Sequence, residues 1–505
     1  MNEVTDQSVM NELTDHEREA ATDTDVLIAG AGPVGLFLAN ECARRGLRWR
    51  LVEARAAQSQ HSKALAIFPR TLEIFDMAGI AAPFLEKANR VTWVTAITSG
   101  RTLARVRFEP AASPYRFVAM VPQDLTERLL AEELPRKGGA VEYDTALVAA
   151  EQKDGRVEVT LDRKGETIRL RASYVVGCDG AHSKVRHLLN LPFAGEAYQD
   201  SFLLADVETN DALPADEMQL CPSEFGPLAI FPMSATRRRI VAMIDQVEGD
   251  APSLELVRKL LVERGPRGIE ARSLHWSSYF RIHHRQVARL REGRIFVAGD
   301  AAHIHSPFGG QGMNTGLQDA WNLVWKLDLA VRGRGSAQLL ESYTAERRPV
   351  ISGVIALTHA MTRALGTRSR VAMVLRNALF PLISRLPPVQ RAFVRRLSQL
   401  GIDYRGSPIV EGNGERYFDD SLRGGSGIKS RFLVLTGDDL DAATVQAAKS
   451  LCNEFADIVE QHSARRPGLT LVRPDGYIAY AGNAGLGVAA VTSLRAALAR
   501  MTGSP

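Results

Sequence analysis

The first regular pattern in the sequence consists of two apolar runs with an amphipathic stretch between them. Residues 25–29 (DVLIA) form an apolar run that ends before a glycine, which is typical of a buried strand. Residues 33–45 (PVGLFLANECARR) are typical of a helix that ends at Gly46, and residues 47–52 (LRWRLV) indicate the next strand. The pattern therefore predicts a strand–helix–strand unit, for which a right-handed crossover is the default.

The middle of the chain has a different pattern. Residues 195–290 contain short alternating runs, such as SFLLADVE and RRRIVAMID, which proline and glycine interrupt; they predict an inserted antiparallel sheet. Residues 294–298 (RIFVA) return to a buried strand, and residues 312–332 predict a long helix. The apolar side chains on one face of that helix are Leu317, Ala320, Leu323, Val324, Leu327 and Val331.

Arginine is frequent in the helical pattern of residues 350–400. A basic amphipathic helix could lie on a membrane surface. Because Pro387 and Pro388 interrupt the pattern, we expect instead a solvated helix that packs across the first domain. The arginines are Arg363, Arg368, Arg370, Arg376, Arg385, Arg391, Arg395 and Arg396.

Composition limits the classes of protein. At 505 residues the chain exceeds one ordinary core, so we expect two or three domains. The net charge of +4 gives no reason to expect a nucleic-acid partner, and no apolar run is long enough to span a bilayer. The acidic residues 1–22 do not resemble a secretory signal and are expected to be a disordered extension. The cysteines form no CxxC pair, so neither a metal site nor a disulfide framework is expected, and a reducing cytoplasm is the simplest location.

A glycine-rich turn, GAGPVG at 30–35, lies between the first predicted strand and helix. Gly30 suits a tight turn, Gly32 lets the backbone approach a pyrophosphate, and Gly35 lets helix and strand pack closely. The helix N-terminus then faces the negative charge. Glu53 ends the second strand, about 20 residues further on, where its carboxylate would meet ribose hydroxyls. The turn predicts a dinucleotide site without separating FAD from NAD(P).

A second glycine-rich loop follows the strand at 294–298. Asp300 ends that strand in GDAAH, and the loop continues as SPFGGQGMN at 306–314 into the long helix. The carboxylate can accept hydrogen bonds from a polyol chain, and the glycines admit a flat ring against the backbone. The helix N-terminus, with about half a positive charge, suits the anionic edge of a reduced flavin. This loop therefore favours a flavin.

A third strand, turn and helix occupy residues 175–186 (VVGCDGAHSKVR), although Asp-Gly after a strand is a common turn. The order of the three motifs resembles that of the class A flavoprotein monooxygenases, the para-hydroxybenzoate hydroxylase family, and within it the phenol and polyketide hydroxylases. The resemblance covers residues 25–350 and includes GDAAHIHSPFGGQGMNTGLQDAWNLVWKL and YTAERRP at 343–349. The string LVRPDGYIAY resembles the thioredoxin-like C-terminal domain of the same branch.

The resemblance implies an α/β fold with a Rossmann-like FAD-binding domain, an inserted antiparallel β-sheet substrate domain and a C-terminal thioredoxin-like α/β domain. The last domain holds only one cysteine, Cys452, so we expect it to serve stability or dimerisation, which leaves a homodimer open. The expected boundaries are 1–22 for the N-terminal extension, 23–194 and 291–370 for the FAD-binding domain, 195–290 for the substrate-binding domain, 371–401 for a helical linker and 402–505 for the C-terminal domain.

The resemblance also implies which residues hold FAD. Lys63 stands where many relatives place an arginine near the phosphates, and it keeps the charge but loses the bidentate fork. Gln123 would reach FAD, and Asp300 would bind the ribityl–phosphate segment. Asp179 and Gly180 belong to a segment that relatives associate with both FAD and NAD(P)H. The ADP half would be bound by Gly30, Gly32, Pro33, Val34, Gly35, Glu53 and Ala54, and the isoalloxazine by Pro307, Gly309, Gly310, Gly312, Met313 and Asn314.

The implied reaction is a monooxygenation. NADH or NADPH reduces FAD, O2 adds at the ring's C4a position, and the terminal hydroperoxide oxygen passes to a phenolic or polyketide-type aromatic molecule. Because only one complete dinucleotide fingerprint is present, NAD(P)H is expected to bind transiently. Candidate pocket walls are Phe225, Phe231, Met233, Pro307, Phe308 and Gly309, among which Phe308 would narrow the space over the flavin.

The sequence does not identify which residue would act as a catalytic acid or base. The candidates cluster before the returning strand and are His275, Trp276, Tyr279, Phe280, Arg281, His283 and His284. Baeyer–Villiger or epoxidising chemistry and hydroxylation that inactivates an antibiotic stay open as alternatives. A non-oxygenating flavin dehydrogenase or a non-catalytic flavin module is less favoured, and the absent WxWxIP string counts against a halogenase.

Overall fold

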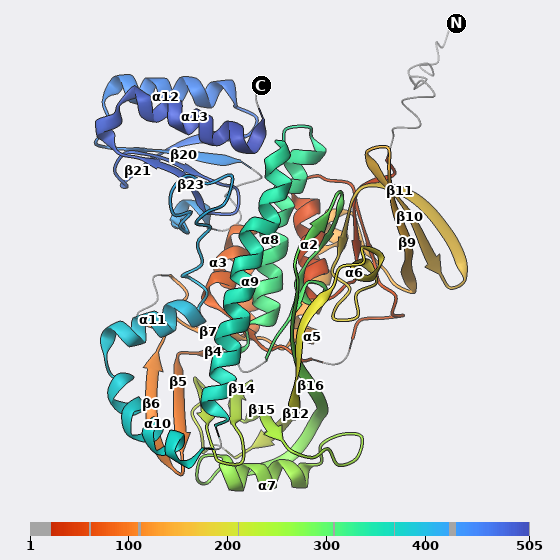
Figure 1. Ribbon diagram of the computed structural model, residues 1–505, viewed down its shortest axis with the longest axis vertical. Helices are drawn as coiled ribbons and strands as arrows, with labels where there is room; N and C mark the ends of the chain where they lie inside the picture. Colours follow the sequence, from red (N-terminus) through yellow and green to blue (C-terminus); the bar gives the residue numbers. More distant parts are fainter. Residues whose placement is uncertain are drawn as a thin grey trace, which may run out of the picture.

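A computed structural model describes residues 22–59, 62–109, 113–210, 212–306, 309–367, 369–423 and 431–503. The fold is mixed α/β with separate sheets, as predicted. Two long helices, α8 (Gly312–Val331) and α9 (Ala337–Leu365), run along the middle of the molecule. Figure 1 shows a small C-terminal unit at one end of these helices and a large antiparallel sheet near the other end.

The first sheet contains the predicted strand–helix–strand unit. Its central strand β1 is parallel to β11 on one side and to β2 on the other, and helix α2 (Pro33–Arg44) connects β1 to β2. Strands β9 and β10 extend β11 as an antiparallel flap. The strands are β1 (Thr24–Ala29), β2 (Trp49–Val52), β8 (Val141–Glu142), β9 (Thr145–Lys153), β10 (Arg156–Arg163), β11 (Glu166–Gly177), β17 (Arg291–Glu292) and β18 (Ile295–Val297).

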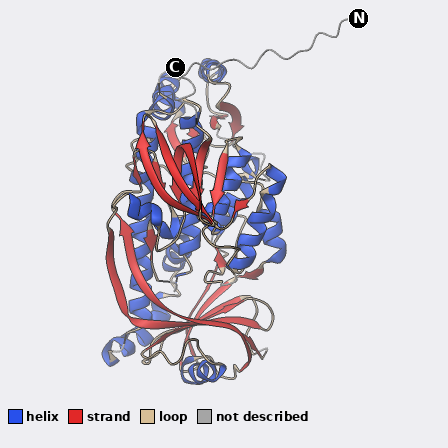
Figure 2. Ribbon diagram, turned by 90° about the vertical axis from the view of Figure 1, so that its right-hand side faces the viewer, coloured by secondary structure: helices blue, strands red, loops and turns tan. Residues whose placement is uncertain are grey.

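The second sheet has the order β19-β16-β12-β15-β14-β13-β5-β6. Most of its pairs are antiparallel, but β13 and β5 are parallel, and β5 and β6 precede the range expected for the inserted sheet. Helix α7 (Leu254–Arg264) lies beneath it in both views (Figures 1 and 2). The strands are β5 (Trp93–Thr98), β6 (Arg101–Arg107), β12 (Phe193–Thr209), β13 (Glu217–Cys221), β14 (Leu228–Pro232), β15 (Arg237–Ile244), β16 (Ala271–Val287) and β19 (His303–Ile304).

Shorter elements connect the two sheets. A small sheet of order β3-β7-β4 lies between them in sequence and contributes to the wall of the site described below. The elements are β3 (Ala66–Ile67), β4 (Asn89–Val91), β7 (Val118–Met120), α3 (Pro69–Met77), α4 (Ala81–Lys87), α5 (Gln123–Glu133) and α6 (Lys184–Leu188).

The arginine-rich stretch folds as the end of α9 followed by α10 (Arg370–Ile383) and α11 (Pro387–Leu397). Helix α10 lies against β6, whose residues belong to the range expected for the first domain, and none of its residues is buried. Helix α11 buries only Val394 and Leu397.

The C-terminal unit is a sheet of order β21-β20-β22-β23 with two helices. Strand β20 is parallel to β21 and antiparallel to β22, which gives the thioredoxin-like α/β arrangement predicted. Trp325 and Leu329 of α8 share its apolar core. The elements are β20 (Phe432–Gly437), β21 (Val459–Ala464), β22 (Leu469–Val472), β23 (Ile478–Gly482), α12 (Ala442–Glu454) and α13 (Val488–Thr502). No helix in the described part of the chain is long and apolar enough to cross a membrane.

Candidate active site

The three sequence motifs meet at one edge of the first sheet. The register pairs Ala29 with Gly177 and Gly177 with Val297, so β1, β11 and β18 end side by side. The turns that follow these strands therefore begin next to one another. In open parallel sheets, ligands bind outside the carboxyl ends of the strands.

The first turn leaves open space in front of helix α2. Gly30 has φ 101°, and a Cβ atom there would lie 2.5 Å from the carbonyl oxygen of Cys178. A Cβ on Gly35 would lie 1.9 Å from the carbonyl oxygen of Gly30. At Gly32, by contrast, no described atom beyond the chain neighbours lies within 4 Å of the Cβ position, and no side chain caps α2. Free amides that face open space fit a pyrophosphate.

Val34 packs the first turn against the second loop. A Cβ on Gly299 would lie 2.9 Å from Val34 Cγ2, and a Cβ on Gly316 would lie 2.7 Å from the same atom. Glycine at these two positions therefore lets helices α2 and α8 approach closely, and Pro33 begins α2 beside them. This contact fixes the first turn and the Asp300 loop relative to each other.

Glu53 holds the first turn from the neighbouring strand. Its Oε2 accepts a hydrogen bond from the amide of Ala31 at 2.8 Å, and its Oε1 accepts one from Arg55 Nε at 2.9 Å. Burial raises the pKa of the Glu53 carboxyl, but these hydrogen bonds outweigh it and hold the pKa below its ordinary value. The ionised carboxylate lies at the sheet edge beside the exposed Ala54, where a ribose hydroxyl could donate to it.

Lys63 and Gln123 lie on segments that adjoin the edge. Gln123 Oε1 accepts a hydrogen bond from the amide of Ala64 at 3.1 Å, and Nε2 donates to Glu127 at 2.9 Å. The Gln123 side chain thus holds the Lys63 segment in place. Lys63 is exposed, and its positive charge lowers the pKa of Asp300.

Asp179 and Gly180 form the turn of the third motif. Asp179 accepts hydrogen bonds from Ser183 Oγ and, at 3.1 Å, from the amide of Val185, so it holds the first turn of α6, whose N-cap is Ser183. Gly180 has φ 77°, which favours glycine. Arg186 of α6 donates to the carbonyl oxygen of Ala301 at 3.0 Å, so the third motif is tied to the second.

Asp300 is presented by a turn that is fixed from behind. The Asp319 carboxylate accepts hydrogen bonds from the Gly299 amide at 3.1 Å and from His303 Nε2 at 2.7 Å. Surrounding protein atoms raise the pKa of Asp300, while His303 and Lys63 act in the opposite direction. The side chain is nevertheless exposed to water, so we expect a carboxylate that can accept hydrogen bonds at neutral pH.

The loop before α8 is held by side-chain amides. Asn314 Nδ2 donates to the Ala66 carbonyl at 2.8 Å, and Asn314 Oδ1 accepts from the Phe68 amide at 2.9 Å. The first turn of α8, with Gly312 and the half-buried Met313, has no side-chain cap. Its amides can therefore face a negative charge. Pro307 and Phe308 lie outside the described residues.

An apolar cavity of about 20 Å³ adjoins this loop, with room for one water-sized molecule. Among the predicted pocket walls, Phe231 and Gly309 line it, and Met233 packs partly buried in the adjoining core. Phe225 is 54% exposed and does not line it. No titratable side chain belongs to the described lining, which is Ala66, Phe68, Val94, Met218, Leu220, Phe231, Gly309, Gly310, Met361, Phe393 and Leu397.

The histidine and aromatic cluster is spread along β16. His275 Nε2 lies 3.3 Å from Glu208 Oε1 near the surface, Tyr279 donates to the Glu248 carbonyl, and Phe280 stacks on Phe202. None of the described side chains of this cluster lines the cavity, and the side chain of His283 lies outside the described part of the chain. The structure thus brings the dinucleotide motifs together but not this cluster.

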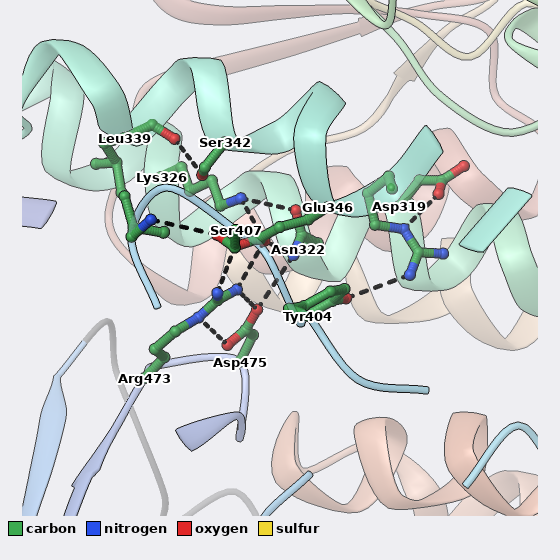
Figure 3. A network of polar contacts seen from close by, with 12 residues as sticks. Asp319, Asn322, Lys326, Leu339, Ser342, Glu346, Tyr404, Ser407, Arg473 and Asp475 are labelled. Carbon is green, nitrogen blue, oxygen red and sulfur yellow. Dashed lines mark hydrogen bonds and ion pairs between the residues drawn. The ribbon is translucent and has the colours of Figure 1, made fainter. Parts of the chain in front are cut away.

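A buried ionic network behind the site was not predicted from the sequence. Figure 3 shows Glu346 of α9 at its centre, with side chains from α8 and from the C-terminal unit around it. Lys326 Nζ lies 2.8 Å and Arg473 Nη2 lies 2.9 Å from Glu346 Oε2, and all three side chains are fully buried. Burial raises the pKa of Glu346, but Arg473 and Lys326 outweigh it and hold the pKa well below its ordinary value.

The next residue, Arg347, extends this network to the turn that carries Asp300. Its Nε donates to Asp319 Oδ1 at 2.7 Å, and Asp319 in turn holds Gly299 and His303. One sequence feature could have indicated the network: Asp319, Asn322 and Lys326 follow helical spacing in an otherwise apolar helix. Their partners in α9 and the C-terminal unit have no local pattern.

Known proteins are similar to this chain in sequence and in fold. A family profile described as "FAD binding domain" matches residues 23–358, and one described as "Aromatic-ring hydroxylase, C-terminal" matches residues 420–505. The chain is 35% identical over 405 residues to the 6-methylpretetramide 4-monooxygenase of Streptomyces rimosus, covering 78% of this chain and 72% of that protein. It is 33% identical over 466 residues to the rifampicin monooxygenase of Streptomyces venezuelae, covering 91% and 95%. The solved structure of the anhydrotetracycline hydroxylase from Streptomyces rimosus matches with a TM-score of 0.78 and 28% identity, covering 95% of this chain and 99% of that chain.

The chain therefore belongs to the family of FAD-dependent aromatic-ring hydroxylases. It is a flavin-dependent monooxygenase, an oxidoreductase that uses FAD as its cofactor. The predicted fold class, cofactor and enzyme class are confirmed.

Proposed function

We propose that this monooxygenase inserts one oxygen atom from O2 into a neutral, apolar aromatic molecule of phenolic or polyketide type, with NADH or NADPH as reductant. The observation that carries this proposal is the apolar cavity beside Gly309 and Gly310, directly before the uncapped N-terminus of α8. Bound FAD would supply electron transfer and oxygen activation at that boundary.

The residues at the sheet edge would bind and orient the cofactor. The open space at Gly32 would receive the pyrophosphate, and Glu53 would accept hydrogen bonds from the ribose. Asp300, fixed through Asp319, would bind the ribityl chain, with Lys63 close to the phosphates. The first amides of α8 would stabilise negative charge on the ring edge, because no side chain caps them.

The cavity lining sets the chemistry of the substrate. A free phenol has a pKa near 10, so it is neutral at pH 7, and a neutral ring can leave water for an apolar cavity at little cost. Phe231 and Phe393 offer aromatic contacts to such a ring. Since the cavity holds about 20 Å³, binding must be accompanied by movement of its walls.

A pair of matched phenylalanine variants tests this assignment. The FAD-loaded protein is assayed with NADH and NADPH against phenols, naphthoquinones and polycyclic aromatics, and peroxide release and product mass are measured together. We expect Phe231→Ala to raise the KM for the accepted substrate about tenfold or more, because an aromatic contact in the cavity wall is lost, and to raise peroxide release. Phe225→Ala, a change in the exposed turn between β13 and β14, should stay within about twofold of the parent. Equal effects of the two changes on KM would show that this cavity does not bind the substrate.

A further inference from the structure

Helices α10 and α11 carry an exposed apolar surface. Nine of the large apolar side chains that are exposed in the described chain lie between residues 371 and 389. The most open of them are Val371 at 71%, Val374 at 68% and Leu382 at 63% exposed, with Leu375 at 54%. Their spacing of three, four and seven residues places these four side chains on one stripe of α10. A solvated helix normally turns its polar face outward, so this surface requires a partner.

The segment that carries the stripe is positively charged. From residue 363 to residue 402 the chain contains eight arginines and no lysine, aspartate or glutamate. Arg370 and Arg385, at the two ends of α10, are exposed. None of the described arginines in this segment forms an ion pair with a described carboxylate. The charge is therefore available to an anionic partner.

The charge decides which partner fits. A second copy packed on the same stripe would bring like-charged arginines together in the interface, which is unfavourable. An anionic bilayer offers an apolar interior to the stripe and negative headgroups to the arginines that flank it, which is the composition of helices that lie in a membrane interface. Figure 1 places α10 and α11 along the outer edge of the molecule, beside β5 and β6, where a flat surface can approach them.

We propose that α10 and α11 form a docking surface for the anionic face of a lipid bilayer, on which the protein adsorbs without spanning it. Helix α11 also adjoins the cavity, because its residues Phe393 and Leu397 line it. Docking would therefore hold this cavity next to the lipid. The docking itself does not depend on which substrate is accepted, so the two proposals can fail separately.

Vesicle sedimentation with the FAD-loaded, full-length protein tests the proposal. We expect the protein to sediment with phosphatidylcholine vesicles that contain about 30% phosphatidylserine. Binding to vesicles of phosphatidylcholine alone should be about tenfold weaker, and about 1 M salt should release the protein from the anionic vesicles, because the charges are screened. Failure to bind the anionic vesicles at low salt overturns the proposal.

Two double variants locate the surface. Val371→Ser with Val374→Ser removes apolar area from the stripe without a change of charge, and binding to the anionic vesicles should fall about tenfold. Val247→Ser with Val262→Ser makes the same change at positions 50% and 85% exposed elsewhere, and binding should not change. Retained FAD and an unchanged circular dichroism spectrum show that each variant is folded. Equal binding by both variants, or a dimer in sedimentation velocity that only the first variant dissociates, contradicts the proposal.

Discussion

The three glycines of the first turn differ in whether the fold leaves room for a Cβ atom. Gly30 and Gly35 are required by the protein itself, because a Cβ atom at either position would collide with a backbone carbonyl. Gly32 is different, since its backbone is extended with φ −77° and its Cβ position faces open space. Nothing in the described fold demands glycine there, so we propose that Gly32 serves the approach of a ligand to the front of α2.

Gly32→Ala should therefore separate folding from cofactor binding. We expect the thermal stability of the FAD-free protein to stay unchanged and the dissociation constant of FAD to rise about tenfold or more, because the methyl group occupies the approach of the pyrophosphate. Gly353→Ala in α9 is the control, since its Cβ also meets no atom, and FAD affinity should not change. Titration of FAD fluorescence measures the FAD affinity of both variants. Unchanged affinity in Gly32→Ala would show that the pyrophosphate does not bind in front of Gly32.

Glu41 on α2 makes part of the stability depend on pH. Burial raises the pKa of Glu41, but Arg44 and Arg45 outweigh it and lower the pKa from 4.5 to about 2. A lowered folded-state pKa contributes stability above the unfolded value and loses it as the pH falls through the folded value. The free energy of unfolding should therefore fall between pH 4.5 and about 2, by about 3 kcal/mol from this group.

Denaturant unfolding of the parent and Glu41→Gln checks this dependence. The difference in unfolding free energy between the two proteins should shrink as the pH is lowered from about 5 to about 3, because Glu41 of the unfolded parent takes up a proton in this range while Glu41 of the folded parent stays ionised. A difference that stays constant over this range would show that the carboxylate of Glu41 is not preferentially ionised in the folded state.

Helices α8 and α9 connect the edge of the first sheet, where the three motifs meet, to the C-terminal unit. Glu346 of α9 binds Arg473 of the C-terminal unit and Lys326 of α8, and the adjacent Arg347 binds Asp319, which holds the Asp300 turn. All these ion pairs are fully buried. Removal of one member of such a set leaves an uncompensated charge, which is more costly than the loss of a surface pair.

Arg473→Met tests whether this network joins the two units. We expect the free energy of unfolding to fall by about 3–5 kcal/mol, and Arg473→Met combined with Glu346→Gln to cost clearly less than the sum of the two single changes. Arg500→Met, in an exposed pair with Glu411, is the control and should cost about 1 kcal/mol or less. Additive costs for the first pair would show that Glu346 and Arg473 do not interact.

The sequence predicts elements better than it predicts their partners. The helix expected at 312–332 is observed as Gly312–Val331, because its apolar stripe is a local pattern. The pairing of β5 with β13, which joins β5 and β6 to the second sheet, was not predicted. Strands that are far apart in the sequence can pair without any local pattern that indicates it. Likewise, glycine spacing predicts the turns around Gly30 and Asp300, whereas Met361 and Phe393 reach the cavity from distant helices.

At the scale of the whole molecule, the two large sheets offer two different environments, one polar and one apolar. The edge of the first sheet would present backbone amides and carboxylates to the cofactor, and the second sheet, with α9 and α11, encloses an apolar space beside the N-terminus of α8. The boundary between these environments is where oxygen would pass from cofactor to substrate. A polar edge and an apolar cavity at the same loop are what a hydroxylation of a neutral aromatic ring requires.

Transfer of oxygen from O2 to the substrate is the central claim, and isotopically labelled O2 tests it most directly. The FAD-loaded protein is incubated with NADH or NADPH and an accepted aromatic substrate under labelled O2 in unlabelled water, and the product is analysed by mass spectrometry. We predict substrate-stimulated oxidation of the reduced nicotinamide and a product that carries one labelled oxygen atom. Turnover that proceeds without O2, or a product whose new oxygen comes from water, would contradict the account.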